Sequence, residues 1–135
     1  MARQIQPLSA MAPALQLDLG RFSLLKSALL QGAREGAQYG IIAPTDSTNI
    51  DATARNATGL TGATATNSVF CECVSGTSVS CTTTCSRGAT LKKYVTVTTT
   101  GSFSSVLRTA TTHFGSNGSW TPPTSATASI TLIVP

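Results

Sequence analysis

The segment Leu17–Ile42, LDLGRFSLLKSALLQGAREGAQYGII, decides how the rest of the chain folds. It contains no proline, and its apolar residues recur three or four apart, so they share one face of a helix. That face carries Phe22, Leu25, Leu29, Ala33 and Gly36, and another, polar face carries Ser27, Gln31, Arg34 and Gln38. The pattern predicts one helix roughly 35–40 Å long. We expect the remaining elements to pack along it.

Small residues are concentrated in the second half of this helix. They are Gly32, Gly36 and Gly40, with Ala33 and Ala37 beside them. Each glycine inside a helix costs roughly 1 kcal/mol relative to alanine, so a compensating close approach is expected. The partner is either a sheet of the same chain or a helix of another subunit. The charged Arg34 and Glu35 in the same segment indicate that this half lies outside a membrane.

The helix is expected to end near Ile42, because the residue before Pro44 avoids helical backbone angles. A short second helix is predicted over Asn49–Thr58, with Thr48 as its N-cap and Gly59 just past its end. It should fold back on the first helix.

Period-two alternation and turn residues predict strands after Thr61. The expected strands are Thr66–Val74, Ser78–Thr84, Lys92–Thr100 and Ala126–Val134. A helix followed by strands indicates an α+β fold, with a four-stranded, mostly antiparallel sheet that lays one face on the long helix. The chain of 135 residues is long enough for one domain, which we expect over residues 17–135.

Residues 1–16, MARQIQPLSAMAPALQ, lack the apolar region of a signal peptide and the run of about 18 apolar residues of a membrane span. Pro7 and Pro13 argue against one regular helix through them. We interpret them as a leader or a remnant of recombinant expression.

Four cysteines are spaced C-x-C-x7-C-x3-C, at Cys71, Cys73, Cys81 and Cys85. Cys71 and Cys73 share one face of a strand, and a turn at Ser75–Thr77 would bring Cys81 opposite Cys73. This arrangement predicts nested disulfides, Cys73–Cys81 and Cys71–Cys85. A zinc site is the competing interpretation, but structural zinc ligands usually come as C-x2-C pairs.

The sequence gives little support for catalysis or for nucleic-acid binding. Only 10% of the residues are charged, and the net charge of +4 comes from scattered basic residues without an aromatic platform. His113 stands alone, and no nucleophile, phosphate-loop or zinc-protease motif occurs. The five acids, Asp18, Glu35, Asp46, Asp51 and Glu72, form no evident catalytic pair. We therefore expect neither an enzyme nor a bound cofactor or metal.

A long connection, residues 101–123, separates the last two strands. Phe103, Val106 and Leu107 are expected to tuck it against the sheet, and Phe114 and Trp120 flank an exposed turn. Long loops are often functional, so this loop is a possible binding loop. The competing interpretation is a variable surface loop whose aromatic residues cover the sheet edge.

Two motifs on the long helix carry a family resemblance. Asp18-Leu19-Gly20-Arg21, and then Ala33-Arg34-Glu35-Gly36-Ala37 with Tyr39, are similar to the N-terminal helix of TadE-like proteins, the pilin-like minor subunits of tight-adherence (Tad, type IVc) pili. The match covers about 25 residues closely and continues as a pattern to the C-terminus. The cysteine hairpin before the strand residues Tyr94–Thr98 also resembles some members.

The resemblance implies a pilin-like fold and a structural role in assembly of a Tad pilus or its secretion apparatus. It implies other pilin-like subunits and the assembly machinery as partners, and an extracytoplasmic location at the periplasmic face of the inner membrane, at the cell surface or outside the cell. It also implies that the native chain is membrane-anchored by a segment absent from this sequence. The alternative function is an exported binding or adhesion module that uses the 101–123 loop.

Overall fold

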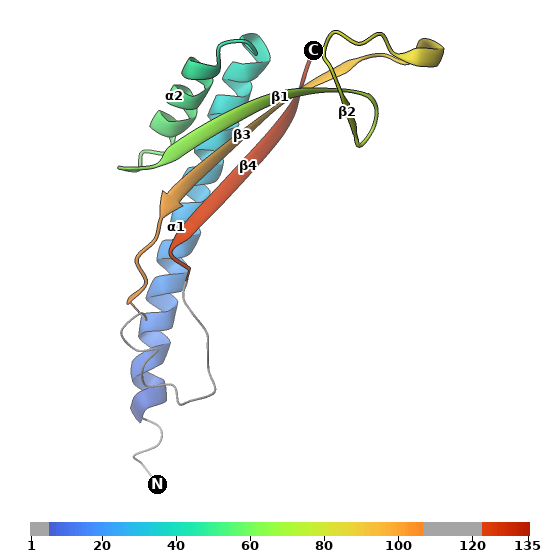
Figure 1. Cartoon of the computed structure of the whole chain (residues 1–135). Coiled ribbons are helices and arrows are strands. Elements are labelled where there is room, and N and C mark those ends of the chain that lie inside the picture. The colour runs from blue at the N-terminus through green and yellow to red at the C-terminus, as the bar shows by residue number, and fades with distance from the viewer. Residues whose placement is uncertain (1–5, 107–122) are drawn as a thin grey trace.

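One long helix, α1 (Gln6–Ile42), packs against the second helix and against two strands of the sheet (Figure 1). The computed structural model describes residues 6–106 and 123–135, with side chains from residue 16 onward. The elements after α1 are α2 (Ser47–Ala57), β1 (Thr64–Val74), β2 (Thr77–Val79), the short 3-10 helix η1 (Ser86–Gly88), β3 (Lys92–Ser102) and β4 (Ser125–Val134). The strands form one antiparallel sheet in the order β2-β1-β3-β4. The expected α+β fold is confirmed.

The start of α1 differs from the prediction. The helix ends at Ile42 as expected, but it begins at Gln6 rather than Leu17 and passes through both prolines. Pro7 lies in the first turn, where a backbone N–H has no partner within the helix, and Pro13 removes one helical hydrogen bond. The 37 residues extend for about 55 Å.

The second helix starts two residues earlier than predicted, and its N-cap is Asp46 rather than Thr48. The Asp46 carboxylate accepts hydrogen bonds from the backbone N–H of Asn49 at 3.3 Å and from its side-chain amide at 2.7 Å. A carboxylate that accepts from the third helical residue satisfies one of the N–H groups that the first turn leaves unpaired. Gly59 lies just past the helix end with φ of 65°, the left-handed conformation predicted for it.

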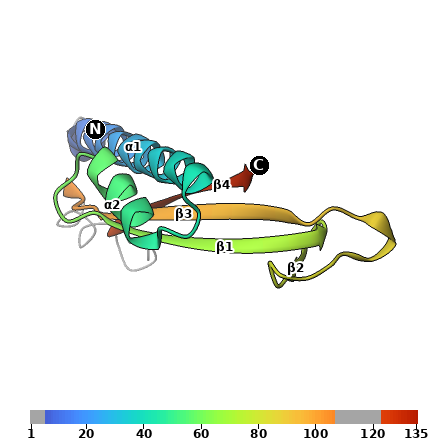
Figure 2. The same cartoon turned by 90° about the horizontal axis from the view of Figure 1, so that it is seen from above.

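Both helices cover the same face of the sheet (Figure 2). The buried core between these layers consists of Leu29, Ala33, Ala37, Ile50, Ala54, Ala63, Val95, Val97 and Ala126. The fully buried Thr99 donates its hydroxyl to the backbone carbonyl of Leu29 at 2.6 Å, so its polar atom has a partner. Val95, Val97 and Thr99 therefore face α1, as their alternation predicts.

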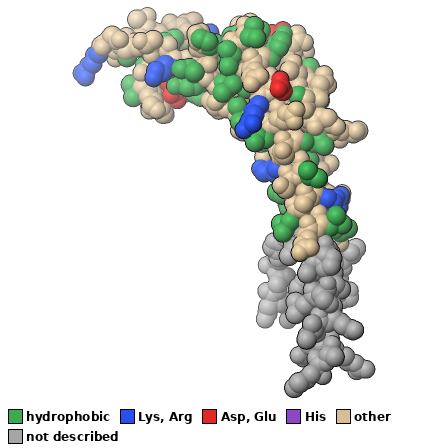
Figure 3. All heavy atoms as spheres, turned by 180° about the vertical axis from the view of Figure 1, so that it is seen from behind, with side chains coloured by type: hydrophobic (Ala, Val, Ile, Leu, Met, Phe, Trp, Pro, Cys, Tyr) green, Lys and Arg blue, Asp and Glu red, His purple; other side chains and the backbone are tan. Residues whose placement is uncertain are grey.

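Two parts of the molecule project from this core. Residues 6–24 of α1, here called the stalk, extend beyond the sheet (Figure 1). Residues 71–93, here called the arm, carry the strand ends, β2 and η1 away from the helices (Figures 1 and 2). Seen from the helix side, basic side chains lie along the molecule and at the far end of the arm (Figure 3).

Candidate functional site

The glycine stripe of α1 is used within the chain itself. A Cβ added at Gly36 would lie 2.6 Å from the Cβ of Ala54 in α2 and 3.0 Å from Cγ1 of Val97 in β3. A Cβ at Gly40 would lie 2.8 Å from Cγ2 of Val95. Atoms at optimal contact are about 3.5–4.0 Å apart, so no side chain fits at either position. The glycine stripe is expected to pack against either a sheet of the same chain or a helix of another subunit. In the structure its partners lie in the same chain, in β3 and α2.

The space beside Gly32 is occupied in the same way, by residues at the end of α2. A Cβ there would meet Cγ2 of Thr58 and would lie 2.5 Å from the backbone carbonyl oxygen of Ala54. The two alanines beside the stripe, Ala33 and Ala37, are fully buried. The small residues therefore let α2 and β3 approach the backbone of α1, and this face of the helix is covered by the same chain.

Gly20 is the exception among the glycines of α1. Among the described residues, no atom outside its own helix backbone and chain neighbours lies within 4 Å of the position its Cβ would take. Leu17 and Leu24 flank it on the same helical face, at the spacing of three and four that forms helix–helix seams. These two leucines are 54% and 73% exposed. The stalk therefore presents two leucines around a glycine that no contact within the described chain explains.

The opposite face of the stalk is tied to the segment after β3. Asp18, only 6% exposed, accepts hydrogen bonds from the hydroxyl of Ser105 and, at 2.9 Å, from the backbone N–H of Val106. A buried carboxylate needs such donors to offset its loss of hydration. Within the Asp18–Arg21 motif, Asp18 thus anchors the helix, a role that the sequence alone did not predict.

Phe103 completes this anchor. Its ring packs edge-to-face on Phe22 with 5.3 Å between the ring centroids, and the guanidinium carbon of Arg21 lies 5.6 Å from its centroid. Phe103 is 8% exposed, as the prediction that it tucks the chain down requires. Val106 is predicted to do the same, but it is 45% exposed, and its contact with Asp18 is made by its backbone N–H.

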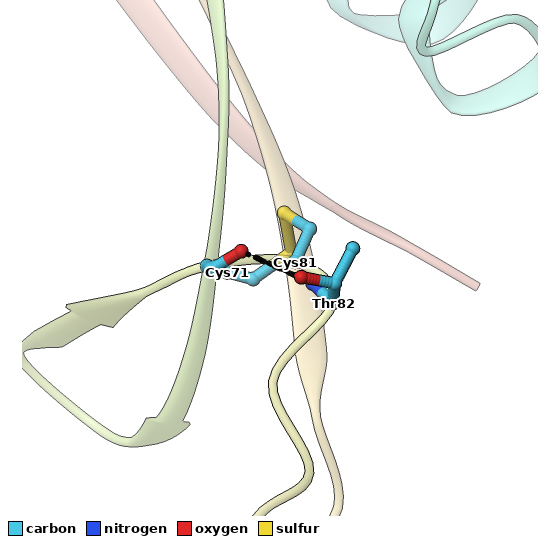
Figure 4. Close-up of a disulfide and its surroundings, with 4 residues drawn as sticks. Cys71, Cys81 and Thr82 are labelled. Atoms are coloured by element: carbon cyan, nitrogen blue, oxygen red, sulfur yellow. Dashed lines mark hydrogen bonds between the residues drawn. A yellow bond between two sulfur atoms is a disulfide. The ribbon is translucent and has the colours of Figure 1, made fainter.

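The arm holds both disulfides, and the predicted nested pairing is wrong. The bonds are Cys71–Cys81 and Cys73–Cys85, with Cα–Cα distances of 5.1 and 5.5 Å. Figure 4 shows the first of them, with Thr82 beside it. All four cysteines are paired, and within the described ranges no group of three or more potential ligands could hold a metal ion.

The hairpin register explains the different pairing. Cys71 lies opposite Val79, and Val74 lies opposite Thr77, with an irregularity between them. The turn is therefore centred earlier than the sequence suggested, and Cys81 does not lie opposite Cys73. The strand predicted over residues 78–84 is present but much shorter. It pairs with β1 over Thr77–Val79, and the chain then turns toward Cys71.

A small polar network joins the end of α1 to the start of α2. The hydroxyl of Tyr39 donates to the Asp46 carboxylate at 2.9 Å. This hydrogen bond is the main cause that raises the pKa of Tyr39, whereas hydrogen bonds from Asn49 and then Tyr39 lower the pKa of Asp46. The two pKa values move apart because the hydrogen bond needs a protonated phenol and an ionised carboxylate. The network stabilises the connection between the two helices.

A second link, which the sequence did not suggest, joins α2 to β1. The side-chain amide of Asn67 lies 2.6 Å from the Asp51 carboxylate and 2.9 Å from the backbone carbonyl of Ser47. Asp51 and Asp46 thus both have structural hydrogen bonds. The remaining candidates, His113 and the loop positions Leu107, Phe114 and Trp120, lie outside the described residues.

No protein-family model, no curated protein and no solved structure matches this chain. In the part of the chain that the structure describes, no helix has a stretch that is long and apolar enough to cross a bilayer. The two disulfides indicate an oxidising, extracytoplasmic environment.

Proposed function

We propose that this chain is a structural, pilin-like subunit that takes part in assembly of a Tad-type pilus or its secretion apparatus. The observation that carries the proposal is the division of α1. One face of its C-terminal half is buried under α2 and the sheet, whereas the stalk extends beyond them with Leu17 and Leu24 more than half exposed. A long helix with a folded head at one end can pack with equivalent helices while the head faces outward.

Gly20 gives this proposal a specific contact. A helical glycine costs about 1 kcal/mol, and the three other glycines of α1 offset that cost through contacts within the chain. At Gly20 the compensation would come from another pilin-like subunit, whose helix approaches between Leu17 and Leu24. The sequence motifs that resemble TadE-like proteins lie on the same helix. In this proposal the glycine stripe builds the head and Gly20 serves assembly.

The test is photo-crosslinking in the native host. A photoreactive phenylalanine analogue is placed at Leu24 and, as the control, at Thr48, an exposed position at the start of α2. We expect crosslinks from position 24 to pilin-like subunits or to components of the pilus machinery, and few from position 48. Deletion of the gene should also reduce the amount of pilus that can be sheared from cells.

Equal crosslinking from both positions would contradict an interface on the stalk. Unchanged piliation in the deletion strain would contradict the structural role itself. The exported binding module that uses the 101–123 loop remains a prediction, because residues 107–122 are not described.

A further inference from the structure

One face of the sheet is turned away from both helices (Figure 2). This outer face carries hydroxyl side chains in register across three strands. Each row takes one residue from β1, one from β3 and one from β4. The rows are Thr64–Thr100–Thr127, Thr66–Thr98–Ser129 and Ser68–Thr96–Thr131. The members on β1 and β4 are exposed and those on the central strand are partly exposed. No charged residue interrupts these rows.

The hydroxyls of β3 and β4 hold one another in place. Thr96 and Thr131 lie 2.7 Å apart, and Thr98 and Ser129 lie 2.9 Å apart, oxygen to oxygen. Each pair uses one O–H as a donor and one lone pair as an acceptor. The second O–H and the remaining lone pairs of each pair are left to bond outward. The face therefore offers fixed, uncharged donors and acceptors.

An apolar row continues the same face. Phe70 of β1 stacks on Tyr94 of β3 with 5.1 Å between ring centroids and 15° between ring planes. Ile133 of β4 lies opposite Tyr94 and is 51% exposed. The strand propensity of threonine would explain single threonines on a solvent-facing sheet. Phe, Tyr and Ile also have high strand propensity, so what distinguishes this face is that an apolar row directly adjoins the hydroxyl rows.

We propose that this outer face binds a neutral, extended polysaccharide, such as a β-1,4-linked glucan. Such a chain is a flat ribbon with hydroxyls at its edges and C–H groups on its faces. Its hydroxyls would pair with the Thr and Ser rows, and its C–H faces would rest on the threonine methyl groups and on the row at Tyr94. The absence of charge within the rows favours a neutral ligand over an anionic one. The site measures about 10 Å across the strands and about 20 Å along them, which is enough for several sugar units.

This inference goes beyond the proposed structural role. The site lies on the opposite face of the sheet from α1, so it does not share residues with the stalk. Its failure would leave the assembly proposal unchanged.

The test measures retention of the purified chain on microcrystalline cellulose, and its retardation by hydroxyethyl cellulose in native gels. The double variant Thr96→Val/Thr98→Val removes two hydroxyls and keeps the branched shape. We expect it to weaken binding by about 5-fold or more, since each lost hydrogen bond changes an equilibrium by roughly 2- to 10-fold. Thr83→Val, at an exposed position on the arm, is the matched control and should bind like the wild type.

A second variant, Thr96→Ser/Thr98→Ser, keeps both hydroxyls and loses only the two methyl groups, so it should bind more tightly than the valine variant. This comparison separates a lost hydroxyl from a damaged fold. Binding to cellulose should also survive high salt, because no ion pair contributes to it. The proposal is overturned by three results: no retention of the wild type on either neutral polymer, equal loss in the Thr83→Val control, or threonine variants that change only self-association in sedimentation.

Discussion

Replacing Gly36 by alanine is the sharpest test of how the head is built. The new Cβ would lie 2.6 Å from the Cβ of Ala54, 3.0 Å from Cγ1 of Val97 and 3.2 Å from the carbonyl oxygen of Ile50. Relief requires α2 to move away from α1 by about 1 Å, because contacts at optimal separation are about 3.5–4.0 Å. Two of the three atoms belong to short, stiff groups, so rotation of a side chain cannot relieve the overlap.

The magnitude follows from two opposing contributions. Alanine improves helix propensity by about 1 kcal/mol, whereas overpacking of a tight core typically costs about 1–3 kcal/mol and more where backbone must shift. We expect a net loss of about 1–2 kcal/mol in the free energy of unfolding. For a chain of 135 residues this corresponds to a fall in melting temperature of about 3–12 °C.

Gly20→Ala is the matched control on the same helix. The described residues leave open space where its Cβ would go, so the propensity gain of about 1 kcal/mol is unopposed in the isolated chain. Thermal unfolding followed by far-UV circular dichroism should show a higher melting temperature for Gly20→Ala and a lower one for Gly36→Ala. If Gly36→Ala melts at or above the wild type, close packing of α2 on the stripe is refuted.

Three further changes test other contacts. The pKa of Asp46 is lowered in the folded chain, so its contribution to folding stability is fully present above the ordinary carboxyl pKa of about 4 and is lost as the pH falls through the lower folded value. Urea unfolding at neutral and acidic pH should show this loss of stability. The loss should be smaller in Asp46→Asn, which has no carboxyl group at this position. Phe103→Ala should cost about 3 kcal/mol in urea unfolding, whereas Val106→Ala on the same segment should cost less than about 1 kcal/mol. Cys73→Ser/Cys85→Ser should lower the free energy of unfolding by about 3 kcal/mol, and a non-reduced peptide map of this variant should still show Cys71–Cys81. A Cys71–Cys85 peptide recovered from the wild type would contradict the pairing.

Local patterns were sufficient to predict most of the architecture. The recurrence of Phe22, Leu25 and Leu29 predicts the buried face of α1, and Pro44 predicts its end, because both depend only on neighbours along the chain. Alternation over Val95 and Val97 predicts the buried face of β3 for the same reason.

Features set by competing or distant interactions were not predictable in this way. Proline at position 13 disfavours a helix locally, yet α1 continues through it, since one lost hydrogen bond does not end a helix of 37 residues. The disulfide pairing depends on the centre of the hairpin turn, and a shift of one or two residues exchanges the partners of Cys71 and Cys73.

The glycines of α1 also show that the sequence alone could not locate the candidate assembly site. Gly20 and Gly36 are equivalent by helix propensity, and the sequence drew attention to Gly36 because it recurs with Gly32 and Gly40. Only the tertiary contacts separate them, since α2 and β3 occupy the space at Gly36 and no described residue occupies it at Gly20. The contact surface proposed for assembly therefore moves from the stripe to the stalk.

The geometry keeps the two proposed surfaces apart. The stalk lies at one end of α1, beyond the sheet, whereas the hydroxyl rows lie on the sheet face that α1 does not cover (Figures 1 and 2). Asp18 and Phe103 fasten the stalk to the segment that leaves β3, so a helix partner would find Leu17 and Leu24 on the side away from that anchor. A subunit packed through Gly20 would then leave the outer face open to a ligand. Variants at Gly20 and at Thr98 should consequently affect assembly and polysaccharide binding independently, each without changing the other.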